Sequence, residues 1–131
     1  MIDTATIQPL NKAWGLNFAV FQNSNFEVHH AYIKSGGYSS CHCHNHKYNL
    51  FYVLSGKLLV HFYRNEETAS NNHIAHTVAL GYGERLIVPP KVWHRFQSVD
   101  DMDVDLIEAY WAESVDPSDI VRKDIGGTYS D

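Results

Sequence analysis

The chain has 131 residues, of which 44% are hydrophobic and 13% aromatic, and its formal net charge is −5. A chain of this size is expected to form a single domain over residues 1–131 without disulfide or metal staples. The acidic balance disfavours nucleic acid and anionic membranes as partners, because both need a basic surface. No apolar run approaches the ~20 residues that span a bilayer, and Met1–Leu10 lacks the pattern of a secretory signal. We therefore expect a cytoplasmic protein.

Short segments rich in β-branched and aromatic residues dominate the chain. The predicted strands are, in order, Phe26–Lys34, Leu50–Leu54, Lys57–Tyr63, Ile74–Leu80, Arg85–Val88, Val92–Gln97 and Val104–Trp111. Ser55–Gly56 and Gly81–Gly83 are expected to be tight turns, and the polar segment Asn65–His73 is expected to be an exposed hairpin tip. Many short strands separated by regular turns predict an all-β sandwich or small barrel.

The C-terminal segment has a different pattern. Asp116–Asp119 offers a helix N-cap, a proline at the first helical position and an acid in the first turn. We expect a short helix from there through Lys123, ended by Gly126–Gly127, and we expect it to close one end of the barrel.

Three histidines, His42, His44 and His46, occupy alternate positions of one short segment. Side chains at i, i+2 and i+4 of a strand point to one face, so the spacing predicts three converging imidazoles. Neutral imidazole is the commonest protein ligand of a transition metal. Cys41 and Cys43 would point to the opposite face, either as buried thiols behind the site or as further ligands.

Two blocks of spaced residues resemble the paired motifs of the cupin superfamily, G-x5-H-x-H-x3-4-E-x6-G and G-x5-P-x-G-x2-H-x3-N. Here the blocks are Gly36, His42, His44, Asn49 and Gly56, and then Gly83, Pro89, Lys91, His94 and Ser98. The resemblance implies an antiparallel jelly-roll barrel that holds a divalent transition metal (Zn, Mn, Fe or Ni) near one mouth. It also implies that His42, His44 and His94 are metal ligands. It assigns no residue to an organic cofactor.

The chain departs from the motif at Asn49, where the family has a glutamate. A neutral amide leaves the charge of a divalent ion uncompensated, which lowers affinity or shifts preference toward nitrogen-loving ions. His46 either supplies the missing donor from the same face or is a solvated residue at the rim of the barrel.

Further segments are similar to the cupin domain of type II phosphomannose isomerases: Lys12–Gly15, Ile87–Arg95, Leu106–Glu108 and Asp119–Arg122. This resemblance implies a mannose-6-phosphate isomerase-like enzyme whose small-molecule substrate is a sugar or sugar phosphate. Aldose–ketose isomerisation needs a metal, a proton shuttle and a cation for the phosphate.

Glu108 and Arg95 are the catalytic candidates. Glu108 is a proton shuttle or substitute ligand if it points inward, and an ordinary surface residue if it points outward. Arg95, like Arg122 in the tail, either binds the phosphate or lies on the surface.

Two other functions remain open at the level of sequence. Three histidines without a carboxylate also suit a metal-dependent dioxygenase, and the barrel could instead be a non-catalytic small-molecule-binding cupin. A homodimer is expected, because exposed edge strands of a barrel need covering.

Overall fold

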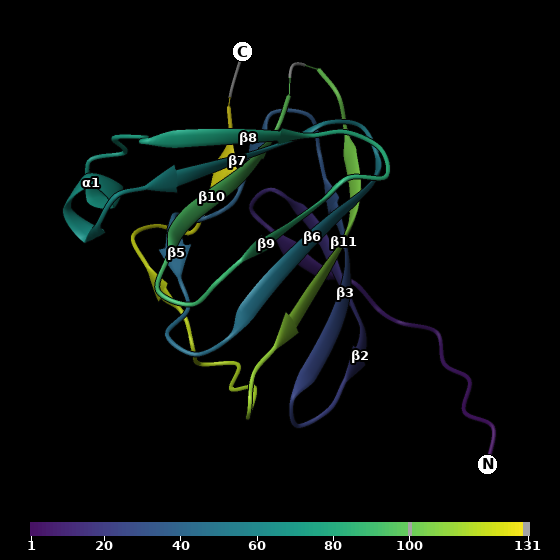
Figure 1. Cartoon of the computed structure of the whole chain (residues 1–131). Coiled ribbons are helices and arrows are strands. Elements are labelled where there is room, and N and C mark those ends of the chain that lie inside the picture. The colour runs from purple at the N-terminus through teal and green to yellow at the C-terminus, as the bar shows by residue number, and fades with distance from the viewer. Residues whose placement is uncertain (100, 130–131) are drawn as a thin grey trace.

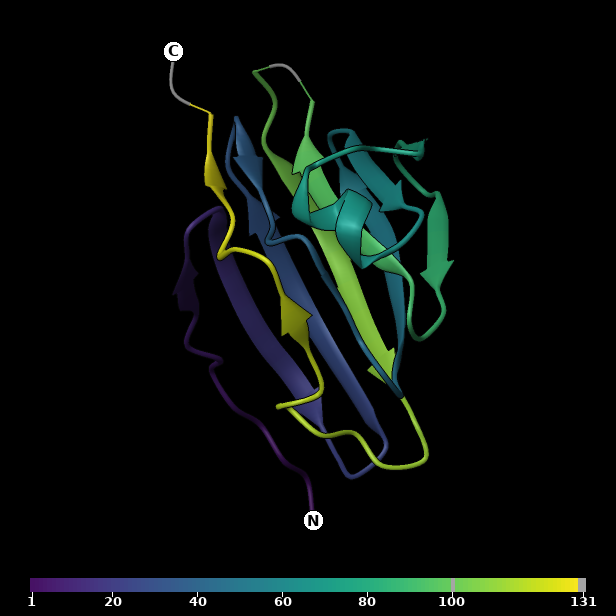
Figure 2. The same ribbon diagram turned by 90° about the vertical axis from the view of Figure 1, so that its left-hand side faces the viewer.

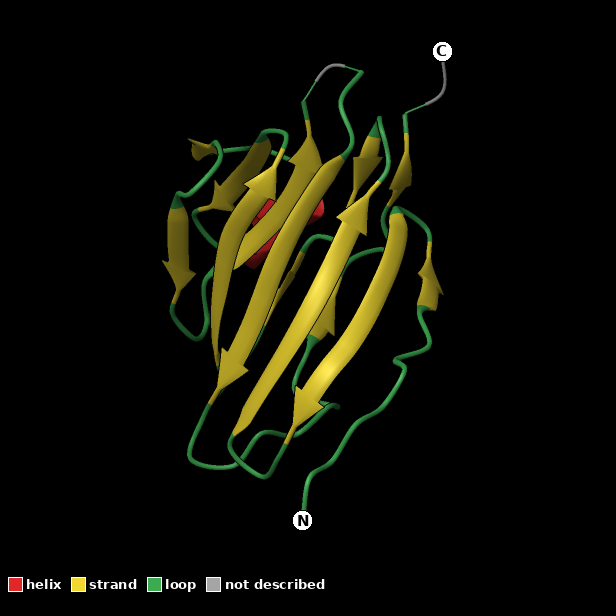
Figure 3. Ribbon diagram, turned by 90° about the vertical axis from the view of Figure 1, so that its right-hand side faces the viewer, coloured by secondary structure: helices red, strands yellow, loops and turns green. Residues whose placement is uncertain are grey.

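The computed structural model describes residues 1–99 and 101–129, which form two facing antiparallel sheets (Figure 1). The first sheet has six strands in the order β1-β2-β3-β11-β6-β9. Their bounds are β1 Leu10–Lys12, β2 Gly15–Gln22, β3 Phe26–Ile33, β6 Tyr48–Ser55, β9 Arg85–Val88 and β11 Val104–Trp111. Figure 3 shows the long strands of this sheet running side by side across one face of the molecule.

The second sheet has seven strands and is centred on β10. On one side β10 pairs with β7, and β7 pairs with β8; on the other side β10 pairs with the short strands β4 and β5, which are in turn followed by β13 and β12. The bounds are β4 Gly37–Tyr38, β5 His42–Cys43, β7 Leu58–Tyr63, β8 His76–Leu80, β10 Trp93–Ser98, β12 Val121–Arg122 and β13 Gly127–Thr128. The C-terminal strands lie in front of the first sheet in Figure 2. Together the two sheets confirm the predicted all-β antiparallel barrel.

The core lies between the sheets because each long strand directs alternate side chains inward. In β3 the inward positions are buried and their neighbours are half-buried. The buried apolar cluster contains Trp14, Ala31, Ile33, Phe51, Val53, Leu58, Val60, Leu80, Val88, Phe96, Val104 and Leu106. A second, smaller cluster of Cys41, Cys43, Tyr63, Ala69 and Trp93 is separate from this core. The reading of the two cysteines as buried thiols is confirmed.

Gly56 shows why the first motif ends on a glycine. Its φ is +83°, and a Cβ there would lie 2.3 Å from the carbonyl oxygen of Asp103. Lys91 occupies the motif's second-block glycine position and also has a positive φ, of 68°. Its backbone N–H donates to the carbonyl oxygen of His44 over 2.6 Å. This strained turn therefore ties His44 to the start of β10, the strand that carries His94.

The predicted C-terminal helix is wrong. The segment forms a turn followed by β12 instead. The Asp116 carboxylate accepts from the backbone N–H of Ser118 (2.9 Å) and from its hydroxyl (2.8 Å). These local bonds stabilise a turn in place of a helix.

The predicted hairpin tip contains the helix α1 (Glu66–Ser70), which Asn65 caps by accepting from the Thr68 N–H over 2.9 Å.

Two N-terminal strands, β1 and β2, were missed, although Leu16, Phe18 and Val20 alternate along β2. Within the described parts of the chain, no helix has the length and apolar character required to cross a membrane.

Candidate metal centre and polar cavity

The structure brings His42, His44 and His94 together at one mouth of the barrel. His42 on β5 lies directly opposite His94 on β10 in the strand register, and His44 follows just beyond the end of β5. One ligand atom from each ring lies within 4.8 Å of the others, and all three residues are buried. This spacing is compatible with three donors around one ion.

Hydrogen bonds set the orientation of each imidazole. The Nδ1 atoms donate to backbone carbonyl oxygens: His42 to Ser40 (2.8 Å), His44 to Asp119 (2.8 Å) and His94 to Val92 (2.9 Å). This tautomer leaves a lone pair on each Nε2. The Nε2 atoms of His44 and His94 are buried without a protein partner. Buried acceptors are normally satisfied, so these residues fit a metal ion.

Asn49 lies on β6, is fully buried, and is tied to Glu108 on the neighbouring strand. Its Nδ2 donates to the Glu108 carboxylate (3.2 Å) and to the Ala109 carbonyl (3.3 Å). Its Oδ1 is buried with no partner among the described residues. The amide oxygen is therefore a free donor atom at the position where the family motif carries a carboxylate.

His46 is not part of the three-histidine group, and its position agrees with the second of its two predicted roles, a solvated residue. The strand ends at Cys43, and beyond it side chains no longer alternate between the two faces of a sheet. The Asp119 carboxylate accepts from the backbone N–H groups of Asn45 (2.7 Å), His46 (3.0 Å) and Lys47 (3.2 Å). The chain bends there, and the His46 side chain is exposed to solvent.

Arg95, a catalytic candidate from the sequence, points away from the histidine group. On β10 the neighbours His94 and Phe96 face the barrel interior, so Arg95 lies on the opposite face. It pairs with Asp124, and its guanidinium lies 5.2 Å from the ring centroid of Tyr38. It is therefore a structural residue that ties the C-terminal segment to the second sheet.

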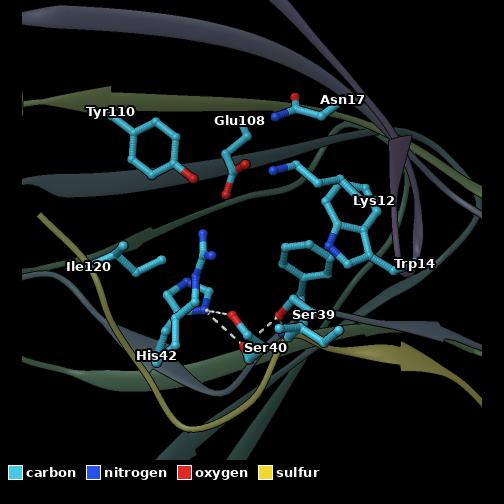
Figure 4. Close-up of a pocket in the computed structure, with 12 residues that line it drawn as sticks. Lys12, Trp14, Asn17, Ser39, Ser40, His42, Glu108, Tyr110 and Ile120 are labelled. Atoms are coloured by element: carbon cyan, nitrogen blue, oxygen red, sulfur yellow. Dashed lines mark hydrogen bonds between the residues drawn. The ribbon is translucent and has the colours of Figure 1, made fainter. Parts of the chain in front are cut away.

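Glu108 points inward into a cavity of about 110 Å³ beside His42. Figure 4 shows the Tyr110 hydroxyl, the Glu108 carboxyl and the Lys12 amine directed into this same space. Burial raises the pKa of Glu108, opposed by hydrogen bonds from Tyr110 and Asn49. Trp14, Ser39 and Ile120 form part of the wall. Arg122, directly opposite His42 in the pairing of β12 with β5, also lines the cavity.

Sequence reasoning missed several residues at this mouth. His29 and Glu27 on β3 and Lys47 after the histidine segment are all buried. The signal for β3 was present, since the alternation that buries Ala31 and Ile33 also turns Glu27 and His29 inward. Nothing in the local sequence indicates that Lys47 is buried.

The buried histidines should make the metal-free protein sensitive to mild acid. Burial lowers the pKa values of His44 and His94 to about 4 and that of His42 well below its usual range. Unfolded histidines take up protons near pH 6.5, so the unfolded state binds more protons between about pH 6.5 and 4. The free energy of unfolding should therefore fall through this window as the pH falls, by roughly 3 kcal/mol for each such histidine.

Urea unfolding at a series of pH values with a chelator present measures this loss. His94→Gln should flatten the dependence, whereas His46→Gln, at an exposed position, should leave it unchanged. A constant unfolding free energy between about pH 7 and 5 would contradict the expectation.

Comparisons with known proteins agree with this architecture. Residues 29–110 match the family described as Cupin domain. Among solved structures, oxalate decarboxylase from Bacillus subtilis, described with Mn(II) centres, is 15% identical with a TM-score of 0.69; the match covers 88% of this chain and 29% of that chain. The capsular polysaccharide assembling protein CapF from Staphylococcus aureus is 19% identical with a TM-score of 0.71 (91% and 33% covered).

KdgF from Halomonas sp. is 14% identical with a TM-score of 0.61, over 75% of this chain and 80% of that one. The chain thus spans only about a third of the larger neighbours, and at these identities the likeness concerns the fold. No curated protein matches the sequence.

Proposed function

The chain belongs to the cupin family, and from this premise we propose that it is a metal-dependent enzyme of the mannose-6-phosphate isomerase type that acts on a small sugar or sugar phosphate. The observation that carries the proposal is the buried Glu108 carboxyl in a polar cavity directly beside a three-histidine group. The resemblance of several segments to phosphomannose isomerase cupin domains supports the choice of substrate.

In this proposal His42, His44 and His94 hold the metal through Nε2, and the Asn49 amide oxygen is the fourth protein donor. A divalent ion in such an open site polarises a carbonyl or hydroxyl oxygen of the substrate. Manganese is among the metals to test, because the bacterial oxalate decarboxylase with this fold is described with Mn(II) centres.

Glu108 is the proposed proton shuttle. Isomerisation of an aldose to a ketose moves a proton between adjacent carbons, and a carboxyl with a raised pKa suits both halves of that transfer. Asn49 orients the carboxyl by a hydrogen bond of 3.2 Å, and the Tyr110 hydroxyl points into the same cavity (Figure 4). The Trp14 ring in the cavity wall offers a surface against which the apolar face of a sugar can pack.

The experiment is an assay of purified protein loaded separately with Mn, Zn, Fe(II) or Ni, using mannose 6-phosphate and measuring fructose 6-phosphate. We expect turnover with at least one metal and none in the presence of a chelator. Stoichiometric metal without any turnover on sugar phosphates would reject the isomerase. Failure to bind any metal at micromolar levels would leave only a non-catalytic binding role.

A second candidate is a three-histidine dioxygenase, favoured by one observation. The clustered histidines include no carboxylate within the described chain, and the family's glutamate position holds Asn49. Oxygen consumption that depends on Fe(II), and that zinc and manganese do not support, would select this reaction over isomerisation.

We also propose a homodimer that pairs the outer faces of two six-stranded sheets, the face shown in Figure 3. Its outward side chains are largely apolar and include Leu16, Phe18, Val28, Leu50, Tyr52, Leu54, Ile87, Ile107 and Trp111. The six strands hold 39 residues in all, so at ~3.4 Å per residue along a strand and ~4.8 Å between strands the face measures roughly 640 Å². This approaches the ~800 Å² per partner of a stable interface, and a two-fold pair is the commonest assembly.

Tyr52→Lys should convert the dimer to a monomer, because it places a desolvated charge within the apolar face. Light scattering coupled to gel filtration measures the change. Tyr82→Lys is the matched control. Tyr82 is 80% exposed in a turn, so the protein with this substitution should remain dimeric. A monomeric wild-type protein at about 100 µM would reject this interface.

A further inference from the structure

Beyond Tyr110 the polar cavity continues into a second hollow of about 210 Å³. The two hollows share Lys12, Tyr110 and Arg122 as wall residues. The second hollow also reaches the histidine group directly, because His44 is part of its wall and the His44 ring centroid lies 5.5 Å from that of Tyr110. A single small molecule can therefore reach from the histidine group into the second hollow.

Three cations line this second hollow, and none of them forms a direct ion pair with another described residue. Lys47 is only 6% exposed, and its ammonium lies 4.2 Å from the centroid of the Tyr110 ring. Within the described residues, no carboxylate oxygen comes within 4.0 Å of the charged nitrogens of Lys47, Lys12 or Arg122. Burying an ammonium group without a partner is costly. The buried Lys47 shares the wall of the hollow with Lys12 and Arg122, and this arrangement indicates a negatively charged ligand.

The other polar residues of the hollow fit the same ligand. Glu27 accepts from the Gln22 amide (2.6 Å), and the Nε2 atom of His29 lies 3.6 Å from the same carboxylate oxygen, too far for a hydrogen bond. Both ring nitrogens of His29 are buried without a hydrogen-bond partner, so the ring has a donor available. Around the two hollows together, three cations outnumber the two acids, Glu27 and Glu108. The whole chain, by contrast, has a net charge of −5. The cavity is thus locally cationic in an acidic protein.

We infer that Lys47, Lys12 and Arg122 form an anion-binding subsite that takes the phosphate or carboxylate group of a small substrate whose other end lies at the histidine group. His29 donates a further hydrogen bond to this anion. The statement about the other end rests on the proposed function, whereas the subsite itself needs no metal. It also assigns the anion-binding role to residues other than Arg95, which faces the opposite side of the sheet.

Binding of inorganic phosphate and, separately, of malonate to the metal-free full chain tests the subsite by calorimetry. We expect saturable binding of at least one anion to wild type. Lys47→Met, which keeps the aliphatic stem, and Arg122→Met should each weaken binding by about tenfold or more, because charge-assisted hydrogen bonds are lost. Lys57→Met, at an exposed position remote from the cavity, should bind as wild type does. Tighter binding of phosphate selects an organic phosphate as substrate, and tighter binding of malonate selects a carboxylate.

Absence of saturable binding of both anions, or wild-type affinity in Arg122→Met and in a folded Lys47→Met, would overturn the inference. Arg122 is exposed, so its variant remains informative if Lys47→Met does not fold. The outcome is separable from that of the proposed function. Metal-dependent turnover without anion binding would refute only the subsite, and anion binding without turnover would refute only the isomerase.

Discussion

His94→Ala is expected to abolish stoichiometric metal binding. His94 is fully buried and directly faces His42 across the β5–β10 pair, so its loss leaves two imidazoles on one side of the site. Outer-shell changes alone cost 10–100-fold in metal affinity, and the loss of a ligand should cost more than about 100-fold. Elemental analysis after dialysis and the metal-induced rise in melting temperature measure the effect.

His46→Ala is the matched control for this variant. It lies in the same segment but its side chain is exposed, so metal content should equal that of wild type. His94→Gln, which nearly preserves volume, separates the loss of a ligand from the cavity that alanine leaves in the core. Full metal content in both His94 variants, or loss of metal in His46→Ala, would contradict the assignment.

Glu108→Gln is expected to lower the turnover number by roughly 10²- to 10⁴-fold while metal content stays unchanged. The amide has almost the same shape and can still pair with Asn49, but it cannot accept and return a proton. The comparison is made on metal-loaded protein with the sugar phosphate that wild type turns over, recording kcat and KM separately. The fall should appear in kcat, because the carboxyl acts in the proton transfer.

Glu67→Gln makes the same chemical change on the exposed surface of α1 and should have the kinetics of wild type. If Glu108→Gln instead loses its metal, Glu108 acts as a ligand or as the support of Asn49, and the proton shuttle must be sought elsewhere. Unchanged kcat with full metal content would remove Glu108 from the mechanism.

The sequence predicted most of the barrel because its strands have local signatures. Arg85–Val88 and Val104–Trp111 match the observed strands residue for residue. Other predicted ends differ by a few residues. The C-terminal helix failed because a first-turn pattern was interpreted without its partners: Asp119 uses its carboxylate on the backbone of residues 45–47. Such a contact between distant parts of the chain leaves no local signal.

The same distinction applies to the site. Motif spacing was sufficient to select His42, His44 and His94, which the structure brings together, and to mark Asn49 as a departure. Alternation along a strand did not predict the position of His46, because β5 is only two residues long. Side chains at alternate positions share a face only as long as the chain stays extended. Arg95 lies outside the cavity for a related reason, since adjacent residues on a strand face opposite sides and His94 faces inward.

By itself, the sequence determined the antiparallel barrel and three of the histidines that cluster in it, because periodicity and motif spacing are properties of neighbouring residues. Only the tertiary structure decided which polar side chains share the cavity. Glu108 faces inward by its phase on β11, while Lys47, Lys12 and Arg122 come from three separate segments to line one hollow. Burial and charge at such a place depend on packing between strands far apart in the chain, which no local pattern records.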